Sequence, residues 1–436
     1  MTIENIAKDF ESGAIKNQNL EQVIFTEVCA KDASRVAEAC RIAAKLRCEI
    51  LEKKTGVQLP VIKESMVDTC SLVAGQAVLA GIESKIGSAC IPMGYAGPAK
   101  IRGQYVSPDE ELYIPLATNE AALVAGVQRG FKAIALAGGL KTLVHFDGMS
   151  RAPMLEAPDI YAAADFCKSA KNNPSLIAEL QSCIKDPFVK LKDIETWQLG
   201  TKVIIRLICT TGDAMGMNGV TKAAADISRY LLTKLSGWKL LTISSNMCTD
   251  KKSSHINILH GRGKSVQTEI FIPEEVLTAV FKKGTTSRAV EKVVFHKCYL
   301  GSGFSGTMGG YNVNAANAVA AFFAATGQDM AHVVSSSSIF VQADAVEGGL
   351  HFMVSFPTLE LAAIGGGTLF GTAKEALNLI GCGKFGTTPG DNRCVLRLAE
   401  IAAATVTALD LNTACAQAAG YEMADSHVKL ARGEKE

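Results

Sequence analysis

Two adjacent lysines stand in the polar loop Cys248–Lys252, between segments of very different composition. A lysine pair by itself is more typical of an exposed charged surface. Here, however, a Gly/Met-rich stretch (212–218) lies upstream and a Gly/Asn-rich stretch (309–317) lies downstream. A held ammonium group can stabilise the negative charge that develops on a carbonyl oxygen during a reaction. The pattern therefore indicates a catalytic loop.

The Gly/Met-rich stretch follows an expected strand (203–209) and precedes an expected helix (220–235) and a further strand (239–243). This order predicts a βαβ-like unit. Glycines let a loop approach a ligand closely, and the start of the helix offers free N–H groups to a phosphate. A structural turn with core methionines is the alternative reading, because the stretch is not Gly-x-Gly-x-x-Gly.

A Gly-x-Gly-x-x-Gly pattern does occur at Gly301–Gly306, after the strand-like segment 293–300. In a dinucleotide-binding fold the acidic residue about twenty positions on should end a second parallel strand. Asp329 instead follows a helical segment directly, so we do not interpret this pattern as a dinucleotide site. A second glycine run, Gly365–Thr368, opens a helix and suits either a phosphate or tight packing.

Length and composition predict a globular protein of two or three domains, since the chain has 436 residues of which 48% are hydrophobic. The 44 basic and 43 acidic residues leave no excess to favour nucleic acid or a membrane surface. No apolar run reaches the roughly 18 residues that span a bilayer, and the start lacks signal-peptide features. The 13 scattered cysteines and 7 histidines show no disulfide framework or metal motif. We expect a cytoplasmic protein without a metal.

Local patterns place further elements. The apolar spacing from Asp32 to Lys54 predicts an amphipathic helix that ends at Gly56, and the first eighty residues are expected to be largely helical. The segment 87–98 is expected to be a rigid, turn-rich domain border. Glu120 is expected in the first turn of a helix capped by Thr118 or Asn119, followed by a strand at 141–146. Segments 339–343 and 350–356 read as a hairpin.

Eight motifs, in order and over nearly the full chain, resemble signatures of the 3-hydroxy-3-methylglutaryl-coenzyme A (HMG-CoA) reductase family, and the Thr249–Lys252 form resembles its biosynthetic class. The motifs are Ile91–Pro98, Ala117–Glu120, Asp147–Arg151, Gly212–Asn218, Cys248–Lys252, Gly309–Asn317, Gly327–Asp329 and Gly365–Thr368.

The resemblance implies an α+β fold with a helical N-terminal region, a large α/β substrate domain and an inserted small ferredoxin-like βαβ cofactor domain. The expected parts are a helical domain (1–82), the large domain in two pieces (83–152 and 255–424), the inserted NAD(P) domain (153–243), the catalytic connecting loop (244–254) and a flexible C-terminal tail (425–436).

The family's reaction is a four-electron reduction of HMG-CoA to mevalonate and coenzyme A with two nicotinamide cofactors, in isoprenoid biosynthesis. By resemblance, Lys251 matches the catalytic lysine and Glu120 the proton-donating glutamic acid. Asp329 matches the aspartate that links them, and His427 the acid that protonates the departing thiolate. These groups suit hydride addition to a carbonyl, which needs both charge stabilisation and a proton.

The resemblance also implies binding residues and assembly. The substrate would contact Arg151, Ser244, Asn246, Asp250, Lys252, Lys297 and Asn317. The cofactor would contact Asp213, Ala214, Met215, Gly216, Met217, Asn218, Gly365, Gly366, Gly367, Thr368 and Arg432. The active sites would form between the subunits of a homodimer or a dimer of dimers.

One departure concerns the cofactor. Asp186–Phe188 stand where NADPH-using relatives carry Ser-Arg-Phe to receive the 2′-phosphate. The Asp186 carboxylate would repel that phosphate but could accept hydrogen bonds from a free ribose hydroxyl. We therefore expect NADPH, with NADH as the alternative. Two other functions stay open at this point, namely mevalonate oxidation with NAD in the catabolic direction and non-catalytic binding of an acyl-coenzyme A.

Overall fold

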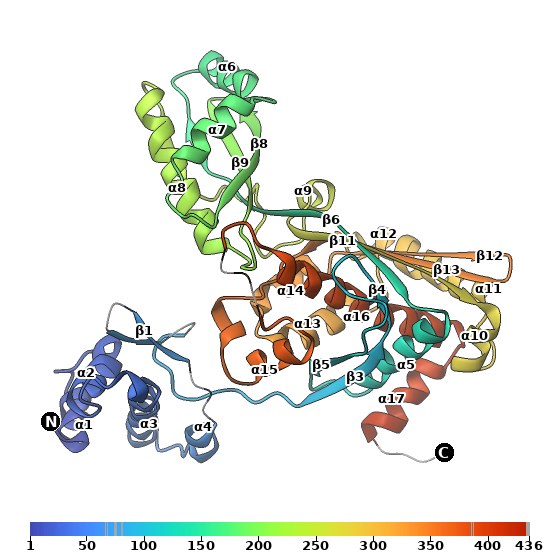
Figure 1. Ribbon diagram of the computed structural model, residues 1–436, viewed down its shortest axis with the longest axis horizontal. Coiled ribbons are helices and arrows are strands. Elements are labelled where there is room, and N and C mark those ends of the chain that lie inside the picture. The colour runs from blue at the N-terminus through green and yellow to red at the C-terminus, as the bar shows by residue number, and fades with distance from the viewer. Residues whose placement is uncertain are drawn as a thin grey trace. The chain divides into compact units, whose positions relative to one another are not determined.

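The computed structural model describes residues 1–65, 67, 69–73, 76–79, 82–384, 386 and 388–432. The chain forms two compact units, one made of residues 1–92 with 366–375 and the other of residues 93–365 with 376–436 (Figure 1). Within the described residues, no helix combines the length and apolar character needed to cross a membrane.

The first unit is mainly helical, as predicted for this region. A core of apolar side chains, centred on Leu20, Ile24, Phe25 and Ala43, joins the helices, and the buried ion pair Arg47–Glu21 (2.5 Å) lies among them. Its regular elements are α1 (Ile3–Glu11), α2 (Leu20–Glu27), α3 (Val36–Thr55), α4 (Pro60–Glu64), β1 (Cys70–Val73), β2 (Gln76–Leu79) and the 3₁₀ turn η5 (Gly366–Leu369).

Two sequence expectations for this unit can be compared with the structure. Helix α3 ends at Gly56 with a left-handed φ of 73°, which confirms the predicted glycine stop. Cys40 on α3 is disulfide-bonded, which corrects the expectation of a chain without disulfides. Spacing alone does not show which cysteines the fold brings together. The described free thiols number eleven.

The second unit is built on an antiparallel sheet that carries one long buried helix. The strands β12 (Phe340–Val346), β13 (Gly349–Leu359), β11 (Gly263–Pro273) and β6 (Leu140–Arg151) lie in that order. The β12–β13 pair confirms the predicted hairpin. Helix α16 (Arg393–Ala418) is buried along most of its length and packs on β6, β11 and β13 and on the helices α5 (Leu123–Leu136) and α13 (Ala315–Thr326).

The inserted domain has the predicted ferredoxin-like topology. Its strands lie in the order β10 (Lys239–Thr242), β7 (Met154–Glu156), β9 (Lys202–Thr210) and β8 (Lys190–Leu199), all pairs antiparallel. In chain order this is 4-1-3-2. Strands β9 and β10 are therefore parallel with β7 between them, and the helix α8 (Met217–Lys234) connects them as a split βαβ unit. Helices α6 (Ile160–Ala170) and α7 (Pro174–Ser182) pack on β8 (Figure 1).

Strand β6 belongs to both sheets and thereby positions the site. Residues 141–148 pair with β11 in the large sheet, and Met149–Arg151 pair with β9 in the small sheet. Arg206 on β9 adds a second connection, because its buried guanidinium donates to the Gly261 carbonyl at 2.6 Å just before β11 and pairs with Glu195 at 2.7 Å. The two sheets therefore meet at Arg151 and Gly261.

Two local expectations were wrong. Residues 293–300, expected as a strand, are helical, in α11 (Ser287–Val294) and the π-helical turn η3 (Phe295–Gly301). Their apolar residues face one side at helical spacing, which outweighs β-branched propensity. The glycines of the 301–306 pattern thus lie in helical turns rather than at a strand-to-helix loop, and the rejection of a dinucleotide site there is confirmed. Part of the expected turn at 87–98 is strand β3 (Met93–Ala99), paired with β5 (Leu112–Ala117).

The remaining elements are short, apart from the last helix. Residues 422–432 form α17 (Glu422–Arg432), a helix that includes most of the segment 425–436 expected as a flexible tail. The buried Glu422 carboxylate contacts Arg129 of α5, so the start of α17 is anchored on the large domain. The others are β4 (Ile101–Arg102), α9 (His255–His260), α10 (Glu274–Val280), α12 (Ser302–Ser305), η4 (Met330–His332), α14 (Val333–Ser336) and α15 (Gly371–Leu379).

The contact between α5 and α16 depends on Gly130. A Cβ atom there would lie 2.0 Å from the Ala408 carbonyl oxygen, so Gly130→Ala should force the helices apart and lower the free energy of unfolding by about 1–3 kcal/mol. The control is Gly303→Ala on α12, where nothing lies within 4 Å and helix propensity should favour alanine. Urea unfolding of both variants checks this, and equal stabilities would contradict the packing argument.

Candidate active site

The catalytic loop runs from Ile243 to Ser254, between β10 and α9. Three of its residues other than glycine have positive φ angles, Asn246 (64°), Thr249 (43°) and Lys251 (58°). Such backbone conformations are costly and persist only where the surroundings fix them. The buried Asn257 amide supplies part of this support, since its Nδ2 donates to the Cys248 and Thr249 carbonyls at 3.3 and 3.1 Å. The loop is therefore a fixed turn.

Asp250 holds the loop between two arginines. Its Oδ1 accepts a hydrogen bond from the buried Arg262 guanidinium at 3.0 Å, and its Oδ2 lies 3.7 Å from Arg151 Nη1. Arg151 also donates to Ser244 Oγ (3.2 Å) and, through Nε, to Thr221 Oγ1 on α8 (3.0 Å). The Asp250 carboxylate thus joins the catalytic loop to both sheets.

Lys251 and Asp329 form the pair that the resemblance implied. Lys251 Nζ lies 2.8 Å from Asp329 Oδ2, and the two side chains are 43% and 38% exposed. Burial raises the pKa of the Asp329 carboxyl, but the Lys251 ammonium, the Ala331 amide and His332 outweigh it, so the pKa lies below its usual value. Asp329 is therefore an anion that holds the Lys251 ammonium in place, and that ammonium is open enough to reach a ligand.

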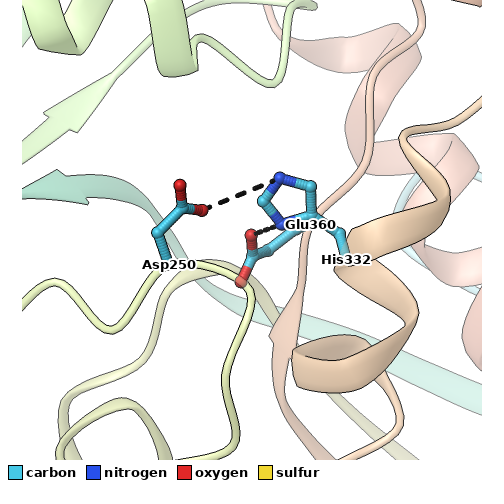
Figure 2. A group of neighbouring side chains, drawn as sticks. All are labelled: Asp250, His332 and Glu360. Carbon is cyan, nitrogen blue, oxygen red and sulfur yellow. Dashed lines mark ion pairs between the residues drawn. The ribbon is translucent and has the colours of Figure 1, made fainter. Parts of the chain in front are cut away.

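A buried ionic cluster lies behind this pair. His332 is fully buried on η4, and its two ring nitrogens face the carboxylates of Asp250 and Glu360 (Figure 2). Glu360 also contacts Arg262. Burial raises the pKa of Glu360, but Arg262 and His332 outweigh it and hold the pKa below its usual value. The cluster is thus a set of paired charges.

The donor atoms of Asp250, His332 and Glu360 lie within 4.8 Å of one another and would suit a divalent cation by type. The Arg262 guanidinium, however, already bonds to both carboxylates and supplies the positive charge that a metal would bring. We assign no metal to this cluster.

The two other predicted catalytic residues belong to different elements. Glu120 is exposed and precedes α5, which begins at Leu123 with Ala122 as its N-cap, so the expected position in the first helical turn was wrong. The positive φ of Ala122 (71°) delays the helix. Within the described part of the chain, no hydrogen bond or ion pair of the Glu120 side chain is observed. His427 lies on α17, and its side chain is outside the described residues.

The predicted substrate residues fall into two groups. Arg151, Ser244 and Asp250 surround the catalytic loop, where Asn246 and Lys252 are exposed and Lys252 Nζ donates to the Asp250 carbonyl at 3.1 Å. Lys297 on η3 and Asn317 on α13 belong to a second group near the Asn-rich run. The Ser253 hydroxyl, which donates to the Met308 carbonyl at 2.6 Å, joins the loop to that run.

The Asn-rich run is held by Asp410 of α16. The buried Asp410 carboxylate accepts the backbone N–H groups of Val313 (3.0 Å) and Asn314 (2.8 Å), and Asn314 Oδ1 accepts from Asn317 Nδ2 at 2.9 Å. Burial raises the pKa of Asp410 to about 6, against the opposing effects of the two amides and of the Lys297 charge. Asp410 therefore fixes the start of α13 and the position of Asn317.

The Gly/Met-rich stretch forms a turn into α8. Gly216 is the N-cap, with φ of 89°, and a Cβ there would lie 2.2 Å from Thr211, so only glycine fits. No side chain caps the helix, which leaves first-turn N–H groups available to a phosphate. Met217 packs in the core of the small domain and accepts from Arg262 at 2.8 Å, so the reading as a turn with a core methionine also holds.

Asp213, predicted to bind the cofactor, is engaged within the protein. Its carboxylate is buried and accepts the N–H groups of Gly386 and Val395, both at 2.8 Å. Its carbonyl accepts from Ala363 at 2.9 Å, and Ala214 pairs with Ile364, which directly precedes Gly365. Asp213 therefore fixes the turn through its carboxylate and its carbonyl.

The other predicted cofactor residues are dispersed. Gly366, Gly367 and Thr368 form η5 and belong to the first compact unit. Asp186 lies beside the first turn of α8, because its Oδ2 would be 3.2 Å from a Cβ on Gly219. Arg432 ends α17, and its side chain is outside the described residues.

Sequence reasoning missed Arg262, His332 and Glu360. Two signals were present in the sequence. Arg262 is flanked by glycines, which permits close approach of its backbone, and His332 lies three residues after Asp329, on the same side of a helical turn. For Glu360 no local signal marks a buried carboxylate at the end of a strand.

The first turn of α8 has no side-chain cap and can bind a phosphate, and Lys251 on the loop that returns from the inserted domain pairs with Asp329. These features suit an oxidoreductase that reduces a carbonyl with a nicotinamide nucleotide. Comparison with known proteins defines the family. Residues 43–432 match the family described as Hydroxymethylglutaryl-coenzyme A reductase. The chain belongs to this family.

Relatives named 3-hydroxy-3-methylglutaryl-coenzyme A reductase include one from Pyrococcus abyssi, 35% identical over 99% of this chain and 100% of the relative. One from Aeropyrum pernix is 38% identical over 99% and 96%. A structure titled as the class II reductase of Streptococcus pneumoniae bound to NADPH shares the fold, with a TM-score of 0.58 and 19% identity over 77% of this chain and 78% of that chain.

Asp410 should make stability depend on pH. Its pKa is about 6 in the folded protein against 3.8 when unfolded, so its favourable contribution is present below about pH 4 and is lost as pH rises through 6. Relative to Asp410→Asn, the free energy of unfolding of the wild type should fall by about 2 kcal/mol between pH 4 and pH 7. Urea unfolding at both pH values measures this, with Asp165→Asn on α6 as the control. A difference that does not change with pH would contradict the assignment.

Proposed function

We propose that the protein reduces HMG-CoA to mevalonate and free coenzyme A with two equivalents of NADPH. The observation that carries this proposal is the Lys251–Asp329 pair on the loop between the small and large sheets. Two hydrides and two protons convert the thioester into a primary alcohol and a thiol, so the site must stabilise an oxyanion in both reductions.

Lys251 is suited to that task. Its ammonium is fixed by the Asp329 carboxylate and by the constrained backbone of the loop, and it is exposed enough to meet a substrate oxygen. A fixed positive charge stabilises an oxyanion without reorganisation during the reaction. Each hydride addition therefore places its developing negative charge beside Lys251.

Two further groups supply protons in this proposal. Glu120 protonates the carbonyl oxygen, and His427 protonates the departing thiolate of coenzyme A. Glu120 lies on the exposed approach to α5 without a partner among the described side chains, so it is free to complete a site. We assign this completion to a homodimer, in which Glu120 of one subunit joins Lys251 and Asp329 of the other.

The cofactor would bind at the start of α8. The uncapped first turn and the side-chain-free Gly216 fit a diphosphate, and Met215 and Asn218 border that turn. When bound, NADPH supplies the hydride. Asp213 keeps the turn in place, and Arg151 connects α8 to the catalytic loop through Thr221. The cofactor turn and Lys251 are thereby held in one framework.

The proposal predicts the effect of removing the ammonium. Lys251→Ala should lower kcat for HMG-CoA reduction by at least about a hundredfold, because the oxyanion loses its main stabilising charge. Circular dichroism and unfolding curves should remain those of the wild type. Lys171→Ala, at an exposed position after α6, is the control and should keep full activity. Near-normal turnover of Lys251→Ala would refute the mechanism.

The shared active site predicts complementation. Glu120→Gln and Lys251→Ala should each be inactive alone, whereas co-expressed chains should form mixed dimers with one intact site and recover part of the activity. The measurement is NADPH oxidation by mixed dimers purified through two different affinity tags. Inactive mixed dimers would place both residues in the same subunit's site.

NADH is a second candidate cofactor, and the position of Asp186 favours it. Its carboxylate beside the first turn of α8 would repel a 2′-phosphate. Asp186→Ser should therefore raise the ratio of kcat/KM for NADPH over NADH by at least about tenfold, or ~1.4 kcal/mol. Asp165→Ser, exposed on α6, is the control. An unchanged ratio would show that Asp186 does not face the ribose.

A further inference from the structure

We propose that His332 is a positioning residue for this reduction, which holds Asp329 in place to pair with Lys251. The expected effect on kinetics rests on the proposed function, whereas the positioning of Asp329 by His332 rests on the contacts between the two side chains. His332 touches no position where substrate is expected, so it acts through the residues that it contacts.

The ring of His332 lies between two sets of carboxylates. Its Nδ1 contacts the buried Glu360, and its Nε2 lies 3.5 Å from Asp329 Oδ2 and 3.8 Å from Asp250 Oδ1. Asp329 Oδ2 is the same atom that pairs with Lys251 at 2.8 Å. A movement of the ring would therefore displace the carboxylate that orients Lys251.

The protonation state follows from the partners. Carboxylate oxygens only accept hydrogen bonds, and a neutral imidazole has only one N–H, so one of its nitrogens would direct a lone pair at an oxyanion. An imidazolium would instead direct an N–H at the carboxylates on each side, where the contacts are ion pairs. The charges that face the ring are Asp250 from the catalytic loop, Asp329 before η4 and Glu360 after β13, with Arg262 and Lys251 one contact further away.

Without His332, these five charged groups would form two separate sets, because nothing among them would connect Asp329 to Glu360 and Arg262. Arg262 bonds to Glu360 and Asp250 but makes no contact with Asp329 among the described residues. His332 is the residue that connects Asp329 to this buried cluster. The catalytic lysine is thus connected to the buried Arg262–Glu360 pair through His332 and Asp329.

Kinetics of His332→Gln test the role. The variant should fold and should lower kcat by about 10–100-fold, the usual effect of losing a partner that orients a reacting group, with KM values within about twofold of the wild type. His351→Gln, which pairs with Glu269 on the sheet, is the control and should keep its activity.

A kcat of His332→Gln equal to that of the wild type would overturn the proposal. So would a folded variant whose defect lies in KM while kcat stays that of the wild type, because that outcome indicates a role in substrate binding and not in orienting Lys251. If His332→Gln does not fold, His332→Asn provides the same comparison.

A measurement on the wild type does not depend on variants or on activity. Among the histidines whose side chains the structure describes, His332 alone is buried. In ¹⁵N-histidine spectra at pH 7 we expect one ring with two protonated, slowly exchanging nitrogens. A neutral buried ring would refute the proposed bridge. An inactive wild type with this spectrum would instead count against the proposed function and leave the bridge intact.

Discussion

The structure of the site depends on the Asp250 carboxylate, which lies between Arg151 and Arg262. A carboxylate taken out of water is costly unless opposite charges and hydrogen bonds replace the lost hydration. Here the two arginines come from strand β6 and from the turn before β11, where the two sheets meet. Neutralising Asp250 therefore also fixes the catalytic loop relative to both sheets.

This arrangement explains how an exposed loop presents a well-placed lysine. Three positive φ angles would be unstable in a free loop, and the contacts of Asp250, the Asn257 amide and the Asp329 carboxylate stabilise them together. Behind the loop, His332 and Glu360 continue the alternation of charges into the core. The cofactor turn is held in the same way, since Asp213 accepts backbone amides from the start of α16.

Much of this could be predicted from the sequence, but unevenly. Two strands of the inserted domain (β9 and β10), the helix α8 and the hairpin β12–β13 followed from local sequence patterns, and the Lys251–Asp329 pair followed from the family resemblance. Residues 293–300 were predicted as a strand because local propensity does not show which face is buried. Glu360 and Asp410 escaped prediction because a carboxylate's burial depends on partners distant in sequence. Asp213 matched a motif, yet its carboxylate is used inside the protein.

The central claim is that this charge-fixed lysine serves the reduction of a thioester to an alcohol. The most direct measurement is the stoichiometry of purified protein with HMG-CoA, in which nicotinamide oxidation, free thiol and mevalonate are quantified together. The account predicts two reduced nicotinamides consumed for each thiol released and each mevalonate formed. Failure of both NADPH and NADH to be oxidised in the presence of HMG-CoA would contradict it.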